Sequence, residues 1–209
     1  MYNKYLKRIF DFIFSLIMIT SLSWLFIVIG ILIMLSSKGK IFYRQKRIGK
    51  NKKEFYILKF RTMKSTAPGD VPTHLLQNPE QYITGIGKIL RKTSMDELPQ
   101  LFNILKGDMS LVGPRPALWN QYDLIAERDK YDANDVRPGL TGWAQINGRD
   151  EIAIPLKASY DGLYIHKMSF FFDVICIFKT VFCVLKHDGV KEGTMEGSKN
   201  NEESVNNWG

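Results

Sequence analysis

The sequence contains few of the residues that build metal sites or disulfide frameworks. Among its 209 residues there are only two cysteines and three histidines. Cys176 and Cys183 lie seven positions apart in an apolar stretch, which predicts small, buried side chains on one helix face. His74, His166 and His187 are isolated, and no spacing indicates a zinc site. Internal repeats are also missing, so the length predicts one ordinary domain.

Acidic residues are nearly absent from the first third of the chain. Residues 1–64 carry fourteen lysines and arginines but only Asp11 and Glu54, within a net charge of +8 for the whole chain. A basic segment of this kind indicates a nucleic acid or an anionic membrane surface as partner. Because an apolar segment lies beside it, we expect membrane lipid as a partner and no nucleic acid.

Ionisable side chains are absent from Phe12 to Leu35. As one helix these 24 residues would measure about 36 Å, against roughly 30 Å of hydrocarbon in a bilayer. The run is too long for a cleavable signal peptide, so residues 1–37 are predicted to be an uncleaved anchor. Basic residues flank it on both sides, which favours a reentrant helix with both ends on the cytoplasmic face. A single span is the alternative, and hydroxyl groups at Thr20, Ser21 and Ser23 could accommodate the bend.

The remaining sequence predicts a mostly helical α/β domain over residues 38–192, with one small β-hairpin. The hairpin comprises Ile41–Ile48 and Phe55–Phe60, and Pro and Gly residues predict a long loop at 65–85 and a turn-rich stretch at 137–149. The apolar spacing predicts helices at Gly87–Lys92, Asp96–Lys106, Ala117–Tyr131, Leu156–His166 and Phe170–Leu185. The last of these suits either the membrane interface or the core. Residues 193–209 are polar and predict a disordered tail.

The stretch SMDELPQLFNILKGDMSLVGPRP, from Ser94 to Pro116, holds the candidate chemistry. Asp96 and Glu97 are adjacent and would point about 100° apart on a helix, so they predict different roles. At a helix N-terminus, free N–H groups would attract a diphosphate and lower the pKa of Asp96, leaving an ionised nucleophile. The alternative is a capping box formed by Ser94 and Glu97, which Pro99 complicates.

Arginines in rigid segments are the candidate phosphate ligands. Arg115 lies between two prolines, and Arg137 lies in a Pro- and Gly-rich turn. Such segments restrict the backbone and present a planar donor group suited to phosphate oxygens. Arg91 and Arg149 are further candidates, and for each arginine a surface ion pair is the alternative.

These motifs resemble the small monotopic phosphoglycosyl transferases, also called bacterial sugar transferases. The resemblance runs from KRIFDF through KFRTM, SMDELPQLFNILKGDMSLVGPRP and VRPGLTGWAQINGR to the apolar segment near Asp173. It implies a reentrant anchor and a compact domain on the cytoplasmic face of the inner membrane. It also implies transfer of a sugar 1-phosphate from a UDP-sugar to undecaprenyl phosphate, with release of UMP, as the first membrane step of glycan assembly.

The same resemblance implies roles for individual residues. Asp96 would be the nucleophile, forming a covalent aspartyl-phosphosugar, with Glu97 as its catalytic partner. Mg²⁺ would be the cofactor and Asp96 its contact, and the sugar would be an N-acetylated one. Basic residues near the anchor, Lys7 and Arg8, would pair with Asp173.

This sequence departs from the family pattern at the bend of the anchor. The family often has Ser-Pro there, whereas this chain has Ser23-Trp24. Without proline, neither a missing backbone donor nor a steric kink forces the bend.

A second hypothesis, a membrane-tethered binding module without catalysis, relies on the basic N-terminal third alone.

Overall fold

The computed structural model describes residues 2–67, 78–148 and 152–185. The predicted tail at 193–209 and most of the loop predicted at 65–85 therefore lie outside the described residues. The helices are α1 (Lys7–Ser21), α2 (Ser23–Ser36), α3 (Gly85–Lys92), α4 (Gln100–Lys106), α5 (Tyr122–Asp129), α6 (Trp143–Gly148), α7 (Ile154–Lys167) and α8 (Phe170–Leu185). The strands are β1 (Phe42–Ile48), β2 (Glu54–Phe60), β3 (Ser110–Val112) and β4 (Gly139–Thr141). The fold is thus mostly helical, as predicted, and has two small sheets where one hairpin was predicted.

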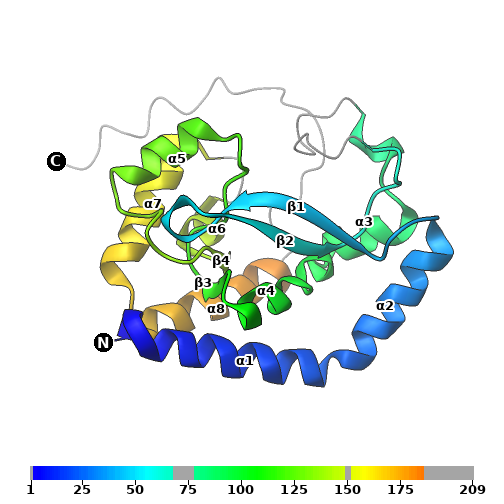
Figure 1. Cartoon of the computed structure of the whole chain (residues 1–209), viewed down its shortest axis with the longest axis horizontal. Helices are drawn as coiled ribbons and strands as arrows, with labels where there is room; N and C mark the ends of the chain where they lie inside the picture. Colours follow the sequence, from blue (N-terminus) through cyan, green and yellow to red (C-terminus); the bar gives the residue numbers. More distant parts are fainter. Residues whose placement is uncertain (1, 68–77, 149–151, 186–209) are drawn as a thin grey trace.

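The N-terminal apolar run forms two helices instead of one. The axes of α1 and α2 are bent by 62°, and most of the other described elements lie within the angle between them (Figure 1). The break falls at Leu22, beside Ser23, and Thr20 donates hydrogen bonds to the carbonyls of Leu16 and Ile17. Among the described helices none is by itself long and apolar enough to cross a bilayer. The bent pair of α1 and α2 together has sufficient length and apolar composition.

Helix α1 carries three of its polar residues on the face that packs against the rest of the protein. Lys7, Asp11 and Ser15 recur every four residues, so they share one side of the helix, and all three are buried. Lys7 forms an ion pair with Asp173 of α8, and Asp11 Oδ1 accepts the Leu111 N–H at 3.0 Å. The opposite faces of α1 and α2 expose large apolar side chains, including Phe14, Ile17, Trp24, Ile27 and Leu35.

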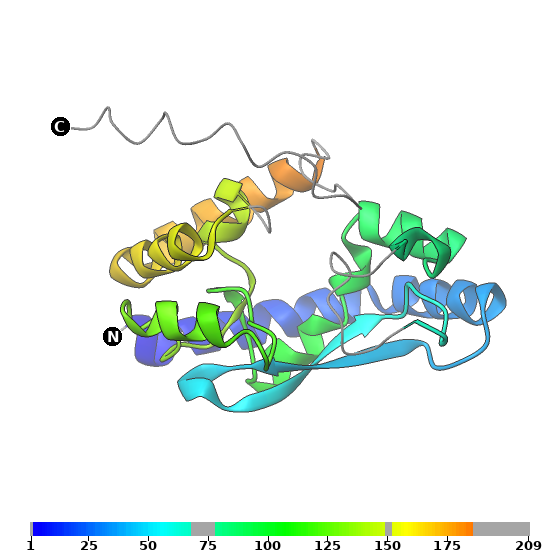
Figure 2. The ribbon, with the colours of Figure 1, turned by 90° about the horizontal axis from the view of Figure 1, so that it is seen from above.

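Strands β1 and β2 form the predicted antiparallel hairpin, with Phe42 opposite Phe60 and Ile48 opposite Glu54. One edge of β2 is held by α4, because the Asn103 side chain accepts from Leu58 N and donates to Tyr56 O. Phe60 packs with Ile29 and Ile33 of α2, so this helix contributes to the core. Seen from above, the hairpin and α8 lie on opposite sides of α1 (Figure 2).

Two predicted helices are shorter than expected. The helix predicted at Asp96–Lys106 begins only at Gln100, because Pro99 has no amide hydrogen, and a 3₁₀ turn (Met95–Glu97) precedes it. The helix predicted at Ala117–Tyr131 begins at Tyr122. Its first residues pair with β1 instead, since Ile48 N donates to Ala117 O.

The parallel pair β3–β4 and helix α6 were not predicted from the sequence. Gly139 lies so close to Gly113 that a Cβ on it would stand 2.1 Å from Gly113 N. The glycines that suggested only turns therefore allow two backbones to approach and pair. In α8, Asp173 and Cys176 are buried whereas Phe171 and Phe178 are exposed, so this helix has both a packed face and an exposed apolar face.

Candidate active site

The two adjacent acids lie in the short turn between α3 and α4. Ser94 adopts a left-handed conformation with φ of 55°, which redirects the chain after α3 into the turn Met95–Glu97. Ser94 makes no side-chain capping bond there. The capping-box alternative is therefore wrong, and the Glu97 side chain is used elsewhere.

Glu97 is held by two cations from different parts of the chain. Its Oε1 accepts from Lys59 Nζ at 2.6 Å and from Arg115 Nη2 at 2.9 Å. Burial acts to raise the pKa of Glu97, but the charges and hydrogen bonds of Arg115 and Lys59 outweigh it. The pKa of Glu97 consequently lies well below its ordinary value, and this carboxylate is fixed in the ionised form.

Asp96 lies beside this arrangement but is bound less tightly. Lys59 Nζ stands 4.0 Å from Asp96 Oδ2, and the Asp96 side chain is 13% exposed. Burial raises the pKa of Asp96, and the neighbouring negative charge of Glu97 adds to the rise. The positive charges of Lys59, Arg91 and Arg115 oppose that rise without cancelling it.

The expectation of a lowered Asp96 pKa is therefore wrong in direction. It assumed that Asp96 would stand at the first turn of an α-helix, where free N–H groups favour the carboxylate. The structure places Asp96 in the 3₁₀ turn before Pro99, partly removed from water, and there desolvation dominates.

The structure brings two of the four predicted arginines to the acids. Arg115 binds Glu97 directly, and the Arg91 charge acts on Asp96. Arg91 itself is oriented by Thr62, whose Oγ1 accepts from Arg91 Nε at 2.9 Å. The alternative of a surface ion pair therefore does not describe Arg115, because its partner Glu97 is largely buried.

Arg137 and Arg8 lie at the opposite end of α4. Arg137 Nε donates to Gly107 O at 2.9 Å, and the two guanidinium groups of Arg8 and Arg137 lie close enough to influence each other. Arg8 donates to the carbonyls of Ile104 and Leu105, which are in the last turn of α4. Arg8 therefore caps this helix and does not pair with Asp173, which binds Lys7 instead. Arg149 lies outside the described residues.

Lys59 is the site residue that the sequence analysis missed. It stands in the KFRTM motif on β2, one position from the buried Phe60, and so its side chain must leave the strand on the opposite face. A lysine between the apolar residues Leu58 and Phe60 of a β-prone run was the available signal. Its side chain is 18% exposed, which requires a partner such as Glu97.

The described residues contain no cluster of three or more histidine, cysteine or carboxylate side chains that would bind a metal by themselves. Mg²⁺, however, is commonly held by one or two carboxylates together with substrate phosphates and water. Asp96 suits that arrangement, because it is the acid of the pair that is not hydrogen-bonded to both Lys59 and Arg115. The donor chemistry of the site is therefore compatible with Mg²⁺ bound jointly with a diphosphate.

The fold and the paired acids agree with a sequence comparison that covers most of the chain. Residues 2–187 match the family described as bacterial sugar transferase. The chain belongs to this family and is a transferase, which leaves the hypothesis of a binding module without catalysis unsupported.

Individual relatives extend the comparison. The chain is 40% identical over 187 residues to the uncharacterized sugar transferase EpsL of Bacillus subtilis, covering 90% of this chain and 91% of that protein. It is 39% identical over 188 residues to the UDP-glucose:undecaprenyl-phosphate glucose-1-phosphate transferase of Escherichia coli. It is 36% identical over 193 residues to the UDP-N-acetylgalactosamine-undecaprenyl-phosphate N-acetylgalactosaminephosphotransferase of Aeromonas hydrophila. The last two alignments cover 86% and 90% of this chain but only 40% and 45% of those longer proteins.

Proposed function

We propose that this transferase moves a sugar 1-phosphate from a UDP-sugar to undecaprenyl phosphate, giving UMP and undecaprenyl-diphosphate-sugar. The names of the Escherichia coli and Aeromonas hydrophila relatives support this reaction class. The product, a sugar on a lipid diphosphate, would begin the assembly of a glycan at the membrane.

The observation that carries the proposal is the different treatment of two neighbouring carboxylates. Glu97 forms ion pairs with both Lys59 and Arg115, whereas Asp96 Oδ2 lies 4.0 Å from Lys59 Nζ. A nucleophilic oxygen must be free of close hydrogen bonds to attack phosphorus, and Asp96 is the less tightly bound acid of the two. The cations around Glu97 are then available to offset the negative charge of an incoming diphosphate.

The proposed reaction has two displacements at phosphorus. An Asp96 oxygen attacks the β-phosphorus of the UDP-sugar, the bond from that phosphorus to the bridging oxygen breaks, and UMP leaves with its electron pair. An oxygen of undecaprenyl phosphate then attacks the same phosphorus, and the Asp96 carboxylate is released. No proton is gained or lost overall, so the site needs no dedicated general base.

Asp96, together with the substrate diphosphate, would hold Mg²⁺. When bound, the ion would neutralise diphosphate charge and stabilise the departing UMP. Glu97, Lys59 and Arg115 would meanwhile keep the turn Met95–Glu97 in place. A positive ion beside Asp96 would oppose the rise that burial causes in the pKa of Asp96, and so would favour its ionised form.

The acceptor is a lipid, so the site must be near a membrane surface. The exposed apolar side chains of α1, α2 and α8 support attachment of this chain to a bilayer. We place the protein on the cytoplasmic face of the inner membrane, with α1 and α2 as a reentrant anchor. The sugar is proposed to be N-acetylated, although the named relatives act on different sugars.

The experiment is a release assay with purified protein, Mg²⁺, undecaprenyl phosphate and a panel of UDP-sugars. The wild type should release UMP from at least one of them, and Asp96→Asn should release none while remaining folded and membrane-bound. Asp129→Asn, which alters an exposed carboxylate on α5, is the control and should keep full activity. Full activity in Asp96→Asn would exclude Asp96 as the nucleophile.

A further inference from the structure

The loop that carries Arg115 is held at four consecutive backbone carbonyls. Pro114 and Pro116 have no amide hydrogens, so the carbonyl groups are the main points at which other elements can hold it. Each of the four carbonyls accepts a hydrogen bond at 2.9 Å: Pro114 O from Gly139 N, Arg115 O from Arg128 Nη1, Pro116 O from Arg47 Nη1, and Ala117 O from Ile48 N. The donors come from β4, α5 and β1, so three elements fix one short loop.

The donor to Arg115 O is itself fixed by a buried carboxylate. Arg128 of α5 directs Nε and Nη2 at Asp161 Oδ2 of α7, at 2.8 Å and 2.6 Å. The side chains of Arg128 and Asp161 are only 4% and 1% exposed. A guanidinium can bind a carboxylate with one edge and a carbonyl with another, because its five N–H donors have a rigid planar arrangement.

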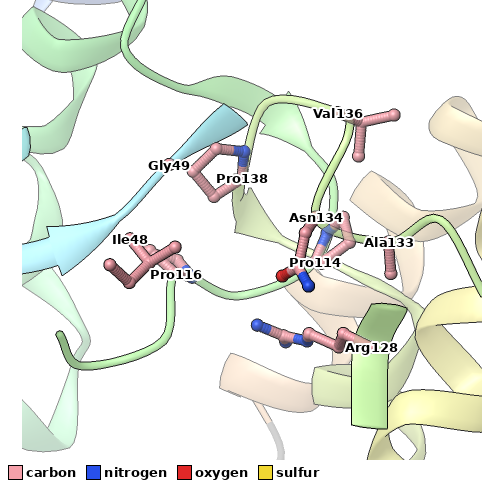
Figure 3. Close-up of a pocket in the computed structure, with 9 residues that line it drawn as sticks. All are labelled: Ile48, Gly49, Pro114, Pro116, Arg128, Ala133, Asn134, Val136 and Pro138. Atoms are coloured by element: carbon pink, nitrogen blue, oxygen red, sulfur yellow. The ribbon is translucent and has the colours of Figure 1, made fainter. Parts of the chain in front are cut away.

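The residues packed around Arg128 restrict the movement of its side chain. Figure 3 shows its guanidinium directed toward the loop with Pro114 and Pro116, beside Asn134. The cavity between them is only about 10 Å³, space for about one water molecule. The Arg115 backbone therefore cannot shift without breaking the bond from Arg128, and Arg128 cannot shift without leaving Asp161.

We propose that Arg128 and Asp161 are positioning residues for the transfer reaction. Asp161 orients Arg128, Arg128 fixes the Arg115 carbonyl, and the Arg115 guanidinium is thereby aimed at Glu97 and at the substrate diphosphate beside Asp96. Neither residue of the pair touches the substrate. This inference rests on the proposed function, since it assigns Arg115 a role in the same reaction.

Arg128→Lys is the main test, because lysine keeps the charge beside Asp161 but cannot bind both the carboxylate and the Arg115 carbonyl. We expect kcat/KM for UMP release to fall by about tenfold or more. Asp161→Asn should cause a similar loss, and where that variant does not fold, Arg128→Lys alone decides. Glu127→Gln, which breaks the pair with Lys130 on the same helix, is the matched control and should change activity less than about twofold.

A double-mutant cycle separates positioning from general destabilisation. If Arg128 acts through Arg115, then adding Arg128→Lys to Arg115→Ala should lower the residual UMP release by less than about twofold. The same tenfold loss in both backgrounds would overturn the proposal, because the pair would then act independently of Arg115. Unchanged activity of Arg128→Lys in the wild-type background would overturn it as well.

A crystal structure of Arg128→Lys reads the geometry without turnover. The contact from Arg115 Nη2 to Glu97 Oε1, 2.9 Å here, should lengthen beyond hydrogen-bonding range of about 3.5 Å. Retention of that contact would contradict the proposal. If the wild type released no UMP from any UDP-sugar, the proposed function would fail, and this structural measurement would still decide whether the pair positions Arg115.

Discussion

Replacing Glu97 by glutamine tests whether the carboxylate between Lys59 and Arg115 is ionised and stabilising. Unit charges at the 2.6 Å distance of Lys59 and Glu97 attract each other by about 6 kcal/mol at an effective dielectric constant of about 20. Desolvation of the three groups offsets most of this attraction. We expect Glu97→Gln to lower the free energy of unfolding at pH 7 by about 1–3 kcal/mol.

The pH dependence of that difference follows from the lowered pKa of Glu97. A carboxyl group with a lowered folded-state pKa contributes stability above its unfolded pKa and loses it as the pH falls toward the folded value. Glu97 has an ordinary value of 4.5, so the difference between glutamate and glutamine should be constant above about pH 5.5. It should shrink by about 0.8 kcal/mol at pH 4.0 and by about 1.4 kcal/mol at pH 3.5.

The assay compares melting temperatures of Asp96→Asn and Asp96→Asn/Glu97→Gln in detergent between pH 7 and pH 3.5. Both proteins carry Asp96→Asn because the two carboxyl groups titrate together, and this change silences one of them. Each kcal/mol of difference in the free energy of unfolding should correspond to about 2–4 °C in melting temperature for a chain of this size. A gap in melting temperature that stayed constant through pH 3.5 would refute the reasoning.

Two further predictions concern the support of the site and the anchor. A Cβ on Gly87 would lie 2.0 Å from Thr62 O, whereas one on Gly85 would meet nothing within 4 Å. Gly87→Ala should therefore lower the free energy of unfolding by about 2–4 kcal/mol, and Gly85→Ala should lower it much less. Equal melting temperatures for these two variants would contradict the packing seen between α3 and Thr62. Single cysteines at Asn3 and Lys40, with Cys176 and Cys183 replaced by alanine, should both be shielded from an impermeant reagent outside the inner membrane. Labelling at one end only would establish a simple span.

Much of the fold was accessible from the sequence because the signals are local. Short β-prone runs on either side of a basic turn predicted β1 and β2, and apolar spacing predicted α7 and α8 within about two residues. The pair β3–β4 was not accessible, because each strand has three residues and they are far apart in the chain. Only their backbone contact, which Gly113 and Gly139 permit, makes them strands.

The site was partly predictable for the same reason. Asp96, Glu97 and Arg115 lie within one motif, so the sequence drew attention to all three. Lys59 reaches Glu97 across 38 positions of the chain, and no spacing rule connects them. The pKa of Asp96 was mispredicted because it depends on burial, which a sequence pattern does not give.

The buried polar face of α1 makes residues 1–37, the proposed membrane anchor, a structural part of the rest of the protein. Without residues 1–37, Asp173 would lose Lys7 and the Leu111 N–H would lose Asp11. The core beside Phe60 would also lose Ile29 and Ile33. A water-soluble enzyme therefore cannot be obtained by truncation alone. It would have to keep these inward-facing side chains and exchange the outward-facing ones.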